Sequence, residues 1–258
     1  GLQTFARIAG VVPRELGPGG ERAISRSAGA HVEEMRWWLN RLPASAQGIV
    51  LENSAITAEF QPLACRWLRP DVTVLANTLP DHQELWGPTS ASAADVLTAG
   101  IPKQGQVILP TGLRSDDYLI ELLERRHCQL FYSEPATGLD EGYLAVNMGL
   151  ALTTLIHMGF EKDTVSTAMR QLQPDRYDFH VANCAGADVA LAFAANDVAS
   201  TRVLFDSLNW SPNETSLIYN HRADRPGRLK SFKEWLSQSR WRDVMIIGDK
   251  PRQDFASA

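Results

Sequence analysis

The chain has 258 residues, of which 44% are hydrophobic and 21% are charged, and its formal net charge is -5. These values are typical of a globular protein with one large domain or two smaller ones. The acidic balance argues against nucleic acid as a partner, because nucleic-acid binding usually needs a basic face. The three cysteines are far apart and form no CxxC pair, which argues against a zinc site and a disulfide scaffold. No run approaches the roughly 18 apolar residues of a membrane span, and we expect a cytoplasmic protein.

Strand-like apolar runs alternate with helical patterns over the first two thirds of the sequence. Runs that end near Gly or Pro predict strands over 4–10, 48–51, 72–76, 106–109 and 129–132. Apolar residues at three- and four-residue steps predict helices over 32–42, 60–68, 92–99, 116–126, 143–158 and 162–171. The helix over 143–158 is apolar almost all round, which predicts that it is buried. The alternation indicates βαβ units and a mainly parallel sheet.

A second α/β unit follows a stretch that loses periodicity and is predicted to be a linker, 173–187. The elements predicted after it are 189–193, a helix over 198–208, a strand over 216–219, a helix over 231–238 and a strand over 244–247. We therefore predict an α/β protein with domains over 1–178 and 184–258.

Three residues with ionisable side chains follow two of the predicted strands. Asp81 and His82 lie just past the strand over 72–76, and Glu52 follows the strand over 48–51. Ligands of open α/β sheets bind at the C-terminal ends of the strands, so these side chains are site candidates. The alternatives are that Asp81 caps the next helix and that Glu52 is a solvated loop carboxylate.

Four segments carry a resemblance to a known family. They are Asn77-Thr-Leu-Pro-Asp-His-Gln-Glu-Leu-Trp-Gly87, Glu52-Asn-Ser-Ala-Ile-Thr-Ala-Glu-Phe-Gln61, Ala192-Phe-Ala-Ala-Asn-Asp197 and Asn220-His-Arg-Ala-Asp-Arg225. In this order they resemble the Mur ligase superfamily, and more narrowly the ligase subunit of poly-γ-glutamate capsule synthases. The resemblance implies a central Mur-ligase-like domain, a smaller Rossmann-like C-terminal unit, and the use of ATP and Mg²⁺. The implied reaction is ATP-dependent addition of glutamate to a glutamate polymer through an acyl phosphate.

The resemblance also implies roles for residues of the predicted active site. Glu52 and His82 would bind the metal, and Asp81 would orient His82 or reach the metal's water shell. Asp81, His82 and Arg176 are the predicted catalytic residues, since Arg176 matches a Mur-ligase arginine that reaches the γ-phosphate. The alternative for Arg176 is a surface arginine of the linker. Mur ligases often carry a modified lysine after the His motif, but residues 90–98 contain no lysine.

Nucleotide contacts are implied for Asn147, Arg176, Asn196 and Asp197. Asn147 is the one strongly polar residue in the apolar helix over 143–158, and its alternative role is a bond to a neighbouring loop. Asp197 precedes a predicted helix, so it is also a natural N-cap residue.

Further nucleotide contacts are implied for Asn220, Arg222 and Asp224, which follow the strand over 216–219. Arg225 belongs to the same cluster of charges. The alternative for this cluster is a turn held by an Asp–Arg salt bridge.

The Gly-rich loop that ends in Lys-Ser or Lys-Thr in this family is missing from the sequence. We expect that the loop belongs to an N-terminal segment outside this sequence, and that this chain alone binds ATP poorly and is inactive. The alternatives are another Mur-type amino-acid ligase and a degenerate homologue that acts as a non-catalytic binding subunit. The implied partners are membrane-bound synthase subunits at the inner face of the cell membrane, and a homo-oligomer is a further expectation.

Overall fold

The computed structural model describes residues 1–26, 31–138, 142–173, 175, 177–223 and 225–249. The chain divides into two compact units, one of residues 1–79 and 90–174, the other of residues 80–89 and 175–258. Residues 80–89 thus belong to the second unit, although they come early in the sequence. The domain limits predicted from the sequence stay a prediction.

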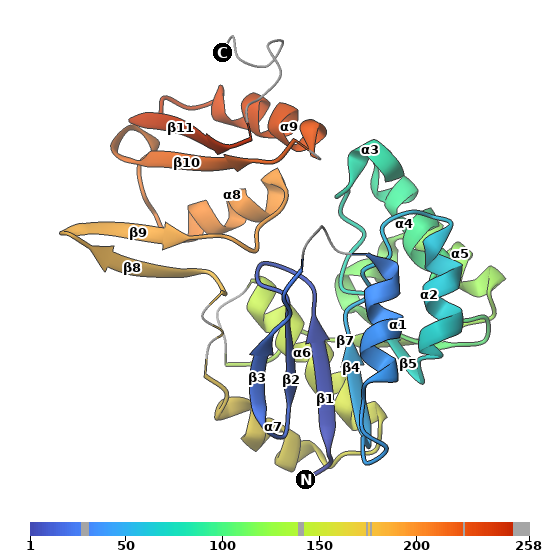
Figure 1. Cartoon of the computed structure of the whole chain (residues 1–258). Helices are drawn as coiled ribbons and strands as arrows, with labels where there is room; N and C mark the ends of the chain where they lie inside the picture. The colour runs from blue at the N-terminus through green and yellow to red at the C-terminus, as the bar shows by residue number, and fades with distance from the viewer. Residues whose placement is uncertain (27–30, 139–141, 174, 176, 224, 250–258) are drawn as a thin grey trace. The chain divides into compact units, whose positions relative to one another are not determined.

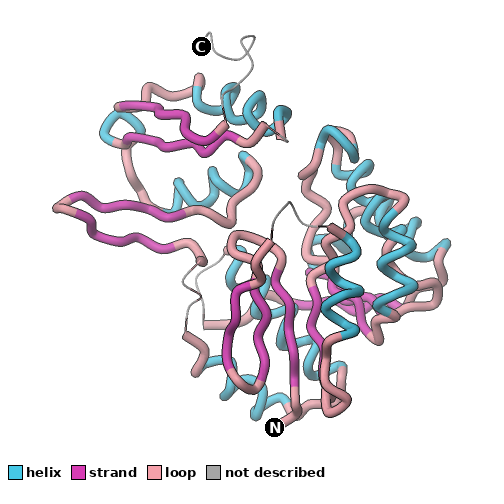
Figure 2. Tube along the Cα trace, viewed as in Figure 1, coloured by secondary structure: helices cyan, strands magenta, loops and turns pink. Residues whose placement is uncertain are grey.

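Two sheets form the first unit (Figures 1 and 2). The four-stranded sheet has the order β3-β2-β1-β4, and the three-stranded sheet has the order β5-β6-β7. Strands β5, β6 and β7 are all parallel, and β4 pairs with β1 in the parallel sense. The strands are β1 (Thr4–Ile8), β2 (Arg14–Gly17), β3 (Gly20–Ala23), β4 (Gly48–Leu51), β5 (Val72–Val74), β6 (Gln106–Pro110) and β7 (Gln129–Ser133).

Helices of the first unit bury one apolar side each. In α1, Val32, Met35 and Trp38 are buried at the three-residue steps that the sequence pattern predicts. Leu119 and Leu123 of α5 pack into the core that surrounds β6. The helices are α1 (Val32–Asn40), α2 (Phe60–Leu68), α4 (Ser90–Ala99), α5 (Asp117–Arg125), α6 (Tyr143–His157), α7 (Lys162–Arg170) and a 3-10 turn (Thr111–Ser115).

The second unit contains a parallel β10-α9-β11 arrangement and an antiparallel hairpin, β8-β9 (Figure 1). Its core is aromatic, because Tyr219 of β10 packs with Phe232 and Trp235 of α9. The elements are α3 (Gln83–Trp86), β8 (His180–Cys184), β9 (Ala187–Leu191), α8 (Val198–Ser207), a 3-10 turn (Pro212–Glu214), β10 (Ser216–His221), α9 (Pro226–Leu236) and β11 (Asp243–Gly248).

The predicted α/β class with parallel pairing is confirmed, and the main differences lie in turns. The stretch predicted as a linker contains β8, whose two-residue turn is formed by Ala185 and Gly186 with φ of 50° and 84°. Positive φ at both positions is the geometry of tight hairpins, but Ala is a weak signal for it. Helix α9 begins at Pro226 instead of the predicted residue 231, because Pro is well suited to the first helical position.

No helix of the described part of the chain is both long enough and apolar enough to span a bilayer.

Candidate functional site

Asp81 and His82 lie in the segment between β5 and α3. His82 has φ 44° and ψ 41°, and it takes the N-cap position of α3 without a capping bond from its side chain. The alternative that Asp81 caps this helix is therefore wrong. The left-handed backbone at a non-glycine residue is uncommon and is often found at functional sites.

Two arginines of the second unit hold the Asp81 carboxylate. Arg225 Nη1 donates to Asp81 Oδ1 at 2.8 Å, and Arg228 Nη2 donates to the same oxygen at 3.2 Å. Arg225 Nη2 lies 2.9 Å from His82 Nε2. An arginine cannot accept a hydrogen bond, so His82 Nε2 is the acceptor and the imidazole proton sits on Nδ1. One guanidinium therefore fixes both residues that the sequence singled out.

The pKa values of Asp81 and His82 are both lowered. Burial lowers the pKa of His82, the positive charge of Arg225 lowers it further, and it falls to about 4. Burial alone would raise the pKa of Asp81, but the charges of Arg225 and His82 outweigh it and the pKa of that carboxyl is lowered. At neutral pH the cluster thus holds an ionised Asp81, a neutral His82 and two arginine cations.

A second carboxylate of the same segment reaches α9. Glu84 Oε1 accepts a hydrogen bond of 2.8 Å from the main-chain N–H of Gly227, in the first turn of the helix. The N–H groups of a first helical turn have no partner within the helix, and the helix dipole favours an anion there. Residues 80–89 therefore present two carboxylates to the beginning of α9.

Glu52 lies after β4 in the first unit and is exposed. Its Oε2 accepts the main-chain N–H groups of Ala9 at 2.6 Å and Gly10 at 3.3 Å. Arg7 Nη1 donates to the Glu52 main-chain oxygen at 3.4 Å, which ties the end of β4 to β1. Glu52 Oε1 takes no part in these bonds, and a carboxylate oxygen of this kind suits Mg²⁺.

The residues around His82 fit a metal ion poorly in this arrangement. A neutral imidazole is the form that binds metals, but its Nε2 faces the guanidinium of Arg225 and two cations lie beside it. Among the described residues, no three His, Cys, Asp or Glu side chains group as metal ligands. The predicted pairing of Glu52 with His82 at a metal stays a prediction, and ligation through Nε2 requires the bond to Arg225 to break.

Asn147 lies on α6 and is exposed. The sequence predicted that this helix is buried, which is wrong for most of it, since only Ala145, Gly149 and Leu150 of it are buried. Gly149 allows α6 to lie close to the main chain of Glu134, because a Cβ at residue 149 would lie 2.1 Å from the Glu134 carbonyl oxygen. Helix α6 therefore has more apolar side chains than its contacts bury. The Asn147 amide is open to solvent.

The other predicted nucleotide-contacting residues belong to the second unit. Asp197 is the N-cap of α8, where its carboxylate accepts from Ser200 N at 2.8 Å and from Ser200 Oγ at 2.6 Å. Asn196 and Asn220 are exposed, as is Arg222. The capping role of Asp197 is confirmed, while nucleotide contact by these residues stays a prediction.

Arg176 and Asp224 lie outside the described residues. Among the described residues, Arg225 pairs with Asp81, and the alternative of a turn held by an Asp–Arg salt bridge stays a prediction.

The sequence did not predict a role for Arg228, for Glu84 or for the buried residues Tyr219 and His221 of β10. Arg228 is three residues after Arg225, a spacing that places both on one side of a helix beginning at Pro226. The signal was present, but it depends on starting the helix at the proline.

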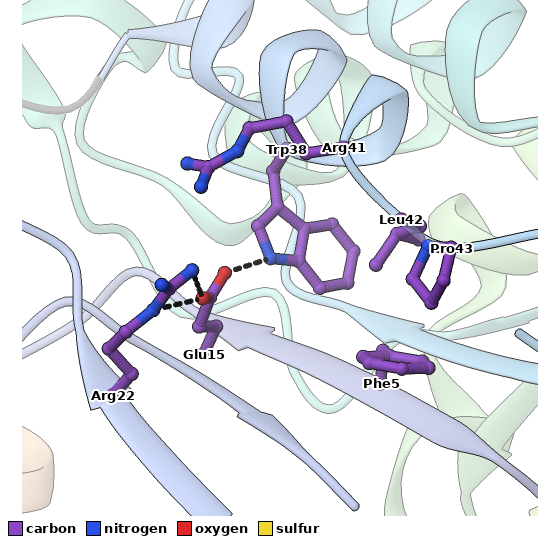
Figure 3. Close-up of a pocket in the computed structure, with 7 residues that line it drawn as sticks. All are labelled: Phe5, Glu15, Arg22, Trp38, Arg41, Leu42 and Pro43. Atoms are coloured by element: carbon purple, nitrogen blue, oxygen red, sulfur yellow. Dashed lines mark hydrogen bonds and ion pairs between the residues drawn. The ribbon is translucent and has the colours of Figure 1, made fainter. Parts of the chain in front are cut away.

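A hollow of the first unit contains none of the predicted site residues (Figure 3). The Glu15 carboxylate on β2 accepts from Trp38 Nε1 at 2.9 Å and from Arg22 Nε at 2.6 Å. Arg41 lies over the exposed Trp37 ring, with its guanidinium carbon 4.3 Å from the ring centre. The Trp38 side chain that lines this hollow is buried.

Comparison with known proteins finds a family match in the C-terminal part of the chain. Residues 155–255 match the family model described as the poly-gamma-glutamate synthase CapB C-terminal domain. Two CapB proteins are similar to a larger part of the chain. The chain is 26% identical over 222 residues to the capsule biosynthesis protein CapB of Bacillus anthracis, covering 79% of this chain and 47% of that protein. It is 24% identical over 237 residues to the PGA synthase CapB of Bacillus subtilis (strain 168), covering 86% of this chain and 59% of that protein.

Solved structures show the same fold at low sequence identity. MurF of Acinetobacter baumannii has a TM-score of 0.64 and 12% identity, covering 86% of this chain and 55% of that one. The bifunctional folylpolyglutamate synthase/dihydrofolate synthase of Yersinia pestis, complexed with AMPPNP and Mn ion, has a TM-score of 0.65 and 12% identity, covering 96% and 74%. The resemblance to Mur ligases and to CapB is thus confirmed. The chain spans about half to three fifths of the length of the two CapB proteins.

Proposed function

We propose that the protein is part of an ATP-dependent amide ligase that adds glutamate to a poly-γ-glutamate chain. The observation that supports this most strongly is the match of residues 155–255 to the CapB C-terminal domain. The chain is also similar to a PGA synthase over 86% of its length, which extends this support to both units. The fold neighbours include a folylpolyglutamate synthase solved with AMPPNP, Mn and L-glutamate, which supports a nucleotide and a divalent metal as cofactors.

The proposed reaction proceeds in two balanced steps. The terminal carboxylate of the polymer takes the γ-phosphoryl group of ATP, which gives an acyl phosphate and ADP. The amine of the incoming glutamate then attacks the acyl carbon, the amide bond forms, phosphate leaves and the amine loses a proton. ATP with Mg²⁺ would supply the phosphoryl group and neutralise its charge.

Residues of this chain have separate tasks in the proposal. Glu52 would hold the metal through Oε1, since Oε2 is fixed by the N–H groups of Ala9 and Gly10. Asn147 would contact the nucleotide from α6, where its amide is exposed. His82 would join the metal only after its bond to Arg225 breaks. Arg176 keeps its predicted role at the γ-phosphate.

Residues of the second unit would also contact the nucleotide in the proposal. Asn196, Asn220 and Arg222 are exposed polar groups next to α8 and β10, and Asp224 keeps its predicted role beside them. Polar groups at the C-terminal end of a parallel strand are well placed for a ligand.

The remaining partners are part of the same proposal. A glutamate polymer is the substrate, and membrane-bound synthase subunits at the inner face of the cell membrane receive it. Support for these comes only from the capsule role in the name of the Bacillus anthracis relative.

The test is phosphate release from ATP by the protein encoded by the complete gene, with Mg²⁺ and with or without glutamate. Glutamate-stimulated release that falls at least a hundredfold in Glu52→Gln, and not in Glu33→Gln, supports the proposal. Stimulation by another amino acid would indicate a different Mur-type ligase. No hydrolysis under any condition would refute the catalytic proposal and favour a non-catalytic binding subunit.

A further inference from the structure

The outer surface of α1 and α2 is rich in arginine. The two helices lie side by side in the first unit and share one buried core cluster (Figure 1). Although the whole chain has 30 acidic residues and 25 lysines and arginines, the stretches 35–42 and 60–69 contain no Asp or Glu. They contain four arginines, all of them exposed: Arg36, Arg41, Arg66 and Arg69. We call these four residues, together with Trp37 and Trp67, the α1–α2 arginine face.

Two of these arginines are held by aromatic rings instead of carboxylates. The guanidinium carbon of Arg41 lies 4.3 Å from the centre of the Trp37 ring on the same helix. That of Arg36 lies 5.6 Å from the centre of the Trp67 ring, which belongs to α2. In the described part of the chain, no carboxylate forms an ion pair with an arginine of this face. A guanidinium that stacks on a ring keeps its N–H groups for other partners, whereas a salt bridge would use them.

Guanidinium groups ordered in this way suit a ligand with several carboxylates. Each can recognise the paired oxygens of one carboxylate, but a single exposed pair contributes little, so useful affinity needs several contacts on one ligand. A chain that carries a carboxylate on every residue meets this condition. A bilayer surface fits less well, because a helix that lies on a membrane needs a free apolar side. That side of α1, formed by Val32, Met35 and Trp38, is already buried in the protein.

We propose that the α1–α2 arginine face binds a γ-linked glutamate polymer through the free carboxylates of the polymer. The identity of the polymer rests on the proposed function, whereas the preference for a carboxylate-bearing chain rests on the face itself. No residue to which the proposed function assigns metal or nucleotide belongs to this face. Weak contacts that form and break one at a time hold the polymer and still let it move.

Fluorescence anisotropy of labelled poly-γ-glutamate with the complete protein, without ATP, tests the face. The double variant Arg36→Gln, Arg41→Gln is expected to weaken binding about tenfold, from about threefold for each exposed ion pair that is lost. The matched control, Arg125→Gln with Arg170→Gln, removes the same charge from exposed arginines of the first unit and should bind like the unchanged protein. Trp37→Leu should weaken binding about threefold without loss of charge, because Arg41 loses the ring that orders it. Binding should be largely lost at about 1 M salt, where the Debye length is about 3 Å.

Vesicles of anionic phosphatidylglycerol distinguish the polymer from a membrane. Polymer binding that falls in the Arg36, Arg41 double variant and not in its control supports the proposal, with far-UV circular dichroism to check that each variant is folded. The proposal is overturned if both double variants bind the polymer equally, or if the protein binds the vesicles and not the polymer. The ligase reaction is judged separately by glutamate-stimulated phosphate release. Polymer binding without that release supports the face and refutes the reaction, while release without polymer binding does the reverse.

Discussion

A buried ion cluster fixes the part of the first unit that contains Glu52. The Arg7 side chain is 0% exposed and its Nε donates to Glu34 Oε1 at 2.9 Å. Arg26 Nη2 donates to the same oxygen at 2.7 Å. Arg7 also donates to the Glu52 main-chain oxygen and to Ser54 Oγ, each at 3.4 Å. The cluster thus connects α1 to the loop after β4.

Glu34→Gln removes the charge between these two arginines and leaves Arg7 buried with only long, neutral contacts. Removal of one partner of a buried ion pair typically costs about 3–5 kcal/mol. Gln keeps one acceptor oxygen, and the Glu34 side chain is 14% exposed, so we expect about 3 kcal/mol. Burial raises the pKa of Glu34, but hydrogen bonds from Arg26 and Arg7 outweigh it and the pKa is lowered. This stabilisation is therefore present above the unfolded-state pKa and is lost as the pH falls through the folded-state pKa.

Hydrogen exchange in increasing urea measures this effect in one unit at a time. Peptides over 4–16 and 31–42 should lose protection in Glu34→Gln, while peptides over 216–236 of the second unit should keep it. Glu33→Gln is the matched control, because Glu33 is the neighbouring residue and its side chain is 78% exposed. Equal protection in Glu34→Gln and Glu33→Gln would refute the reasoning.

Four further predictions follow from single contacts. The His82 imidazole should stay neutral down to about pH 4 in an NMR titration. Because the unfolded chain binds this proton at higher pH, the second unit should lose up to about 3 kcal/mol of stability as the pH falls from 6.5 to 4. A His82 titration near pH 6.5 would contradict this. Gly149→Ala should destabilise the first unit by about 1–3 kcal/mol in urea unfolding, because the added Cβ meets a main-chain oxygen. Asp197→Ala should cost about 1 kcal/mol and Asp197→Asn much less, measured by hydrogen exchange of α8. Asn147→Ala should change the unfolding free energy by less than about 0.5 kcal/mol, and it should weaken nucleotide binding about tenfold if the proposed contact exists.

Local sequence patterns predicted most of the helices and strands, because apolar residues recur at regular spacings along the elements that form the core of each unit. Helix α2 was predicted over 60–68 and occupies Phe60–Leu68, since its apolar spacing and the following Pro70 agree. The pattern failed where burial depends on distant contacts. Helix α6 is apolar almost all round and contacts β5, β6, β7 and α7, yet only Ala145, Gly149 and Leu150 of it are buried. An apolar sequence sets how much surface a helix could bury, whereas its neighbours set how much it does bury.

The candidate site shows the same limit at the level of single charges. Strand ends predicted that Asp81 and His82 matter, but nothing local indicated a partner 144 residues later in the sequence. A half-buried carboxylate must find a cation or many donors, and the chain offers 25 lysines and arginines. The choice falls on Arg225 and Arg228 because Tyr219, Phe232 and Trp235 anchor α9 against β10 and so fix where its first turn lies. The aromatic core of the second unit therefore determines which charge Asp81 meets, and a change in that core should alter the site as surely as a change in the arginines.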